Sequence, residues 1–201
     1  MKKKIIFWIV AILITISAAI YQRQTGPTYP KEVSFHLSGK EYVVELPRSA
    51  SGTDDYTLSL DLPTDMKGKI FYRRFPTDDQ WSSAPLSVKD DNLVAELPGQ
   101  PPAGKLEYYL GLVTKTQLIY IAKSDPVKIR FKGEVPNTIL IPHVLIMFFA
   151  MMFSTLAGLF AMGKISSYRL YGYITLILLA AGGFVLGPLM QYYAFGDAWT
   201  G

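Results

Sequence analysis

Two long apolar segments dominate the second half of the chain. Residues 139–162 and residues 170–194 contain no Asp, Glu, Lys or Arg, and the short basic segment 163–169 joins them. At a rise of about 1.5 Å per residue, each segment is long enough as a helix to cross a hydrocarbon core about 30 Å thick. Because both segments are apolar on every side, they predict two transmembrane helices that form a hairpin.

The chain begins with a similar combination of basic and apolar residues. Lysines at positions 2–4 precede the apolar run 5–20. One interpretation is an uncleaved transmembrane anchor over residues 1–21. The other is a signal peptide cleaved after the small residues Ser17-Ala18-Ala19. The length of the run favours the anchor, and both interpretations place the following domain on the outer face of the membrane.

In the middle of the chain, apolar and polar residues alternate with a period of two. Residues 22–32 contain one Gly and two Pro residues and predict a linker. Residues 33–132 then contain eight short runs rich in Val, Ile, Leu, Tyr and Phe, separated by clusters of turn residues. The predicted strands are Val33–Leu37, Glu41–Leu46, Tyr56–Leu62, Lys69–Phe75, Leu93–Leu97, Leu106–Val113, Leu118–Ala122 and Val127–Phe131. Short strands at this spacing predict an all-β sandwich of about seven or eight strands.

Part of this region resembles a known family. The run from Gly68 to Phe75, then Trp81, then the Pro98-Gly99 turn that leads to Tyr108-Tyr109, is similar to the pattern of an immunoglobulin or fibronectin type III module. The resemblance implies an immunoglobulin-like sandwich inserted between the N-terminal transmembrane helix and the C-terminal hairpin. The cysteine pair of antibody domains is absent. Because this sandwich serves many roles, the resemblance implies a fold and no particular function.

The net charge of +4 arises beside the apolar segments. Residues 21–138 contain 15 Lys or Arg and 15 Asp or Glu, so the predicted domain is neutral, which excludes nucleic-acid binding through an excess of cations. The remaining charges are Lys2, Lys3, Lys4, Lys164 and Arg169 against Asp197. The positive-inside rule places those cations in the cytoplasm. We therefore expect a bacterial inner (plasma) membrane protein with a cytoplasmic N-terminus, an outer β domain, a cytoplasmic turn and an extracytoplasmic tail over 195–201.

One helix face carries residues that can bind metal. His143, Met147 and Met151 are spaced four apart and share a face of the first hairpin helix. Imidazole and thioether groups suit Cu(I), and histidine also ligates haem iron. The alternative is that the methionines fill apolar space while His143 bonds to water or backbone. We expect this alternative and no cofactor, because the other histidine, His36, lies in the β domain.

Small residues recur along both hairpin helices. They are Ala150, Ser154, Ala157, Gly158 and Ala161 in the first helix, and Gly183 and Gly187 in the second. Small side chains let helix backbones approach closely in a bilayer, where lipid supplies no hydrophobic drive for association. These residues predict either packing within the hairpin or contact with a helix of a partner subunit.

The candidate chemistry of the β domain is sparse. Arg73-Arg74, Asp78-Asp79 and Trp81 predict either a ligand-facing loop patch or an exposed strand end with local ion pairs. The chain has no cysteine, and it lacks the hydrolase, metalloprotease and nucleotide-binding motifs. Our leading hypothesis is a non-enzymatic integral membrane protein that presents an immunoglobulin-like domain for binding or assembly with other membrane subunits. The alternative is a copper- or haem-handling accessory subunit of a redox complex, which uses the His143 face.

Overall fold

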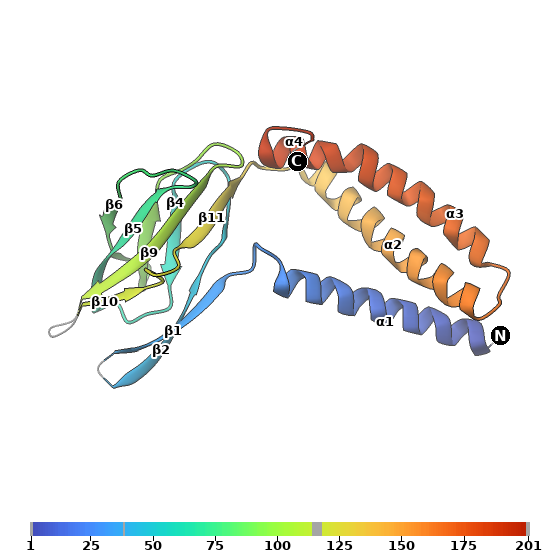
Figure 1. Ribbon diagram of the computed structural model, residues 1–201, viewed down its shortest axis with the longest axis horizontal. Coiled ribbons are helices and arrows are strands. Elements are labelled where there is room, and N and C mark those ends of the chain that lie inside the picture. The colour runs from blue at the N-terminus through green and yellow to red at the C-terminus, as the bar shows by residue number, and fades with distance from the viewer. Residues whose placement is uncertain (1, 38, 114–117, 200–201) are drawn as a thin grey trace. The chain divides into compact units, whose positions relative to one another are not determined.

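The chain forms a mixed α/β structure of two compact units (Figure 1). The computed structural model describes residues 2–37, 39–113 and 118–199. One unit is helical and comes from the two ends of the chain, while the other is β-rich and covers residues 27–133.

The helical unit contains three long helices. They are α1 (Lys2–Thr25), α2 (Asn137–Met162) and a third helix made of α3 (Tyr168–Leu179), the π-helical segment η1 (Ala180–Leu186) and α4 (Gly187–Phe195). All three are long and apolar enough to cross a membrane. Helix α1 continues through Thr25, so the first residues of the predicted linker are helical.

Aromatic side chains fill the contact between α1 and the hairpin. The ring of Phe7 lies 6.1 Å from that of Phe160, and Trp8 makes edge-on contacts with Phe153 and Tyr171. These tilted and edge-on arrangements are the ones that aromatic quadrupoles favour. The apolar residues that the sequence places on these helices therefore pack against one another as well as facing lipid.

The basic residues of the N-terminus and of the link 163–169 gather at one end of the helical unit. The ammonium of Lys3 donates a hydrogen bond of 3.1 Å to the carbonyl oxygen of Gly163, where α2 ends. A cation at this position also interacts favourably with the negative end of the helix dipole. The lysines at 2–4 and the link 163–169 therefore lie on the same side of the unit, as Figure 1 shows.

The β-rich unit contains eleven strands in the part of the chain that the structure describes. They are β1 (Lys31–Leu37), β2 (Lys40–Leu46), β3 (Ser49–Ser51), β4 (Tyr56–Leu60), β5 (Lys67–Arg74), β6 (Ser82–Pro85), β7 (Ser87–Lys89), β8 (Asn92–Leu97), β9 (Lys105–Val113), β10 (Leu118–Ile121) and β11 (Val127–Lys132). Each of the eight predicted runs contains a strand. The three strands that the sequence analysis missed, β3, β6 and β7, are short.

The strands form three sheets. The largest has six strands in the order β3-β11-β9-β5-β6, with β10 also paired to β9; the others are β4-β8-β7 and the hairpin β1-β2. All pairs are antiparallel except β3 with β11. Asp90 and Asp91, with φ of 48° and 59°, make the two-residue turn between β7 and β8, which is the geometry that tight hairpins require.

Alternate residues of these sheets enclose one core. On β9 the side chains of Leu106, Tyr108, Leu110 and Leu112 are buried, and residues of β2, β4, β8 and β11 meet them. The hydroxyl of Tyr108 donates a hydrogen bond of 2.9 Å to the carbonyl oxygen of Pro47, so this buried polar group has a partner. The period of two therefore decides which residues of the six-stranded sheet face inward and which face outward.

Candidate functional site

Helix α2 packs against η1 at Gly182. A Cβ atom added to Gly182 would lie 2.8 Å from the sulfur of Met147 and 2.9 Å from Cγ2 of Ile146, so a side chain does not fit there without movement. Its neighbour Gly183 faces open space, with nothing within 4 Å of an added Cβ atom. The glycine that allows close packing is therefore Gly182, which the sequence analysis did not assign.

His143 contributes a hydrogen bond to the same contact. Its Nδ1 atom lies 3.1 Å from the carbonyl oxygen of Gly182. A carbonyl can only accept, so this bond requires the tautomer with the proton on Nδ1. The same oxygen accepts the N–H of Gly187, five residues later, which is the π-helical pattern. His143 therefore links α2 to the irregular part of the third helix.

The predicted metal-binding face overlaps this hairpin contact. Met147 packs on Gly182, and Met151, one turn further along α2, is half-buried. Over residues 2–37, 39–113 and 118–199, no group of three His, Asp or Glu side chains lies close enough to hold a metal ion. Copper or haem binding by His143, Met147 and Met151 stays a prediction. Metal analysis and an absorbance spectrum of the purified protein test it.

The predicted small residues divide into two groups. Ala150 is buried and Ala157 is half-buried, whereas Ser154, Gly158 and Ala161 are exposed. These last three residues are spaced by four and three positions, so they form one strip along α2, which we call the small-residue strip. An added Cβ atom at Gly158 meets nothing within 4 Å, and one at Gly187 meets only the Gly182 carbonyl oxygen at 3.4 Å.

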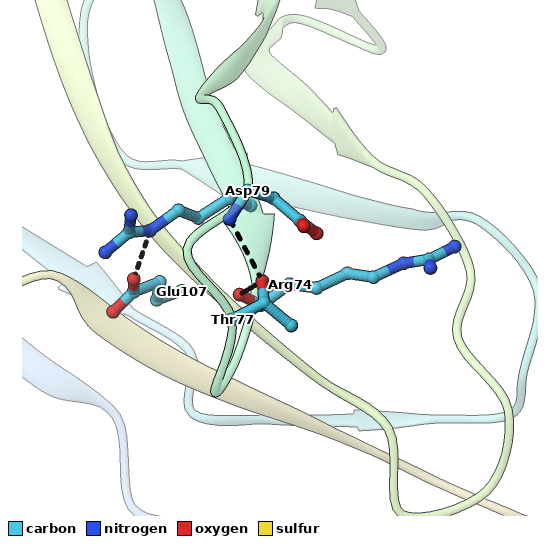
Figure 2. A network of polar contacts seen from close by, with 5 residues as sticks. Arg74, Thr77, Asp79 and Glu107 are labelled. Carbon is cyan, nitrogen blue, oxygen red and sulfur yellow. Dashed lines mark hydrogen bonds and ion pairs between the residues drawn. The ribbon is translucent and has the colours of Figure 1, made fainter.

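A buried ion pair lies on the β-rich unit. The side chain of Glu107, on β9, is 8% exposed, and the Nε atom of the half-buried Arg73, on β5, donates to its carboxylate at 2.5 Å. The guanidinium of Arg73 also lies 4.7 Å from the ring centre of Trp81. Figure 2 shows this pair, with the side chain of Arg74 extending away from Glu107. Arg73 thus pairs across strands rather than with the nearby Asp78-Asp79.

The side chain of Thr77 holds the loop after β5. The hydroxyl of Thr77 donates to the carbonyl oxygen of Arg74 at 2.8 Å and accepts from the N–H of Asp79 at 3.4 Å (Figure 2). The sequence pattern groups Arg73 with this loop and gives no signal for Glu107. The missing signal was the strand register, which sets Arg73 opposite Glu107.

Aromatic rings cover the neighbouring part of the same sheet. The rings of Phe71 and Tyr109 stack with centres 4.8 Å apart, and Trp81 and Tyr120 meet Tyr109 edge-on. Burial raises the pKa of the Tyr109 hydroxyl, and the nearby Tyr120 raises it further. An added Cβ atom at Gly111 would lie 3.0 Å from the Phe71 ring and 3.3 Å from the Tyr120 ring. The glycine therefore makes room for the rings above it.

These features define a protein with three candidate membrane-spanning helices and a β-rich unit between the first and the second of them. Comparison with protein-family models and with curated proteins finds no match to the chain.

Proposed function

We propose that the chain is a non-enzymatic multi-pass protein of the bacterial inner membrane that assembles with other membrane subunits. The observation that carries this proposal is the small-residue strip of Ser154, Gly158 and Ala161, which lies exposed on an apolar helix. Small residues on a membrane helix let a second backbone approach closely enough for extensive van der Waals contact. Since the described part of this chain leaves the strip exposed, a helix of another subunit is its proposed partner.

The proposal includes an orientation and a fold for the β-rich unit. The clustering of Lys3 and the link 163–169 at one end of the helical unit supports a cytoplasmic N-terminus and an extracytoplasmic β domain. The shared core of the six-stranded and three-stranded sheets supports an immunoglobulin-like sandwich. In this arrangement the domain presents a rigid sheet surface outside the cytoplasm for binding.

Replacing Gly158 by leucine is the test of assembly. We expect recovery of crosslinked complexes from membranes to fall by at least about tenfold, which corresponds to about 1.4 kcal/mol of association free energy. The added side chain blocks backbone approach along the strip, while its Cβ atom meets nothing within 4 Å in this chain. The measurement is crosslinking in membranes, followed by purification through a tag on this protein.

Gly172→Leu is the matched control. Gly172 lies on α3, and an added Cβ atom there also meets nothing within 4 Å. This variant should retain the wild-type amount of complex, and both variants should insert into membranes at wild-type levels. A wild-type protein that is recovered only as a lone monomer would contradict the proposed assembly role.

A further inference from the structure

The six-stranded sheet of the β-rich unit carries almost only positive charges. Strands of the six-stranded sheet carry cations at the outward positions, which alternate with the core residues. We call this surface the cationic face, and its strand residues are Lys67, Lys69, Arg73, Lys105, Lys128, Arg130 and Lys132. The only carboxylate in the six strands of this sheet is Glu107, which is buried against Arg73. The aspartates of the unit all lie in connections between strands.

Aromatic rings hold several of these cations in place. The ammonium of Lys128 lies 4.3 Å from the ring centre of Phe75, and that of Lys105 lies 5.9 Å from it. Lys123, at the edge of the face, lies 3.9 Å from the ring centre of Tyr120. Side chains that are already ordered by such contacts lose less conformational entropy when they bind a partner. The face is therefore preorganised for anions.

The face also contains a local conflict. Lys105 and Arg130 are direct cross-strand partners, and like charges in this position destabilise a sheet. Lys132 is two residues further along the same strand. Burial, followed by the charge of Arg130, lowers the pKa of the Lys132 ammonium. These three neighbouring cations concentrate positive charge on this part of the face.

We propose that the cationic face docks an acidic polypeptide segment of a partner subunit. This inference rests on the proposed assembly function and names the contact that the β domain makes within the complex. The charge of the face selects an anionic ligand. Trp81, Tyr120 and Arg73, which line it, are of the residue types that contribute most binding energy at protein interfaces. This composition favours a protein over lipid headgroups or an acidic polysaccharide.

Binding of labelled poly-L-glutamate to the full-length protein in detergent tests the proposal. Fluorescence anisotropy at about 0.15 M NaCl, where unspecific long-range attraction is largely screened, measures the affinity. We expect the double variant K69E/K105E to bind at least about tenfold more weakly than the wild type. Lys69 is exposed and lies opposite Pro85 and Gly111, so its replacement sets no carboxylate against Glu107. The matched control K40E/K89E makes the same change in net charge on β2 and β7, outside the face, and should stay within about twofold.

The single variant K105E separates docking from folding. Lys105→Glu places a carboxylate opposite Arg130, so it replaces a like-charge pair with an opposite-charge pair. Its midpoint of thermal unfolding should therefore be unchanged or higher, while its binding of polyglutamate is weaker. A loss of binding that accompanies a lower midpoint in K105E alone would overturn the assignment of the face.

Three other results would overturn the proposal. The first is that the wild type does not bind polyglutamate, and the second is that both double variants bind it equally well. The third is that the face binds phosphatidylglycerol vesicles or heparin in preference to polyglutamate, which would assign it to lipid headgroups or to a polysaccharide. Because the probe needs no partner subunit, its failure leaves the Gly158→Leu result standing. Failure of that assembly experiment leaves the polyglutamate result equally intact.

Discussion

Replacing Gly182 by alanine is expected to destabilise the helical hairpin by about 2 kcal/mol, because the new methyl group overpacks a tight contact. It would lie within 3 Å of both Met147 and Ile146, so α2 and η1 must separate or these side chains must leave their present positions. Separation also stretches the hydrogen bond from His143 to the Gly182 carbonyl oxygen. A lost hydrogen bond of this kind is worth about 1 kcal/mol.

Gly183→Ala provides the control at the adjacent position. Gly183 is also a glycine and follows Gly182 directly in the sequence, but an added Cβ atom there meets open space. Alanine lowers the backbone entropy of the unfolded chain and favours helix, so this variant should be neutral or more stable by up to about 1 kcal/mol. Unfolding in mixed micelles with increasing sodium dodecyl sulfate, followed by circular dichroism, compares the two variants. Equal midpoints would contradict the assigned contact.

Replacing Arg73 by methionine is expected to lower the stability of the β-rich unit by about 2–4 kcal/mol. The substitution keeps most of the apolar stem but leaves the buried carboxylate of Glu107 without its cation. Removing one partner of a buried ion pair is strongly unfavourable, since the remaining charge has lost its solvent and its partner. Urea unfolding of the full-length protein in detergent, followed by circular dichroism of the β-rich unit, measures the loss.

Two further variants assign this effect to the pair. Arg74→Met changes the adjacent arginine, whose side chain is exposed and extends away from Glu107 (Figure 2), and should stay within about 0.5 kcal/mol of the wild type. The double variant R73M/E107L removes both charges and should recover most of the stability, because an apolar pair of similar volume replaces the buried charges. If Arg73→Met and Arg74→Met had the same effect, the pair would have no special role.

The long elements follow from local properties of the chain. Three helices were predicted from the length of their charge-free segments, and eight strands from apolar residues at a period of two. Strands β3 and β6 were missed because they consist of Ser, Ala and Pro residues, and β7 because it is only three residues long. Strand β3 pairs with β11, which is distant in the sequence, whereas β6 and β7 pair with β5 and β8, the strands next to them along the chain.

The irregular part of the third helix was only partly predictable. Pro188 indicates a disturbance, because proline supplies no N–H to the helix. The π-helical segment Ala180–Leu186 precedes it by up to eight residues. A π-helical turn contains one residue more than an α-helical turn. Apolar runs have similar compositions in both kinds of helix, so the sequence did not reveal where the π-helical turn would lie.

By itself, the sequence determined the number of apolar helices, the position of the β-rich unit between them and the side on which the basic residues gather. Each of these depends on composition along a continuous stretch of chain. Tertiary structure alone distinguished Gly182 from Gly183, joined Arg73 to Glu107 and collected seven cations of a neutral domain on one face of a sheet. Those outcomes depend on register and packing between distant segments, where a shift of one residue turns a side chain from one face to the other.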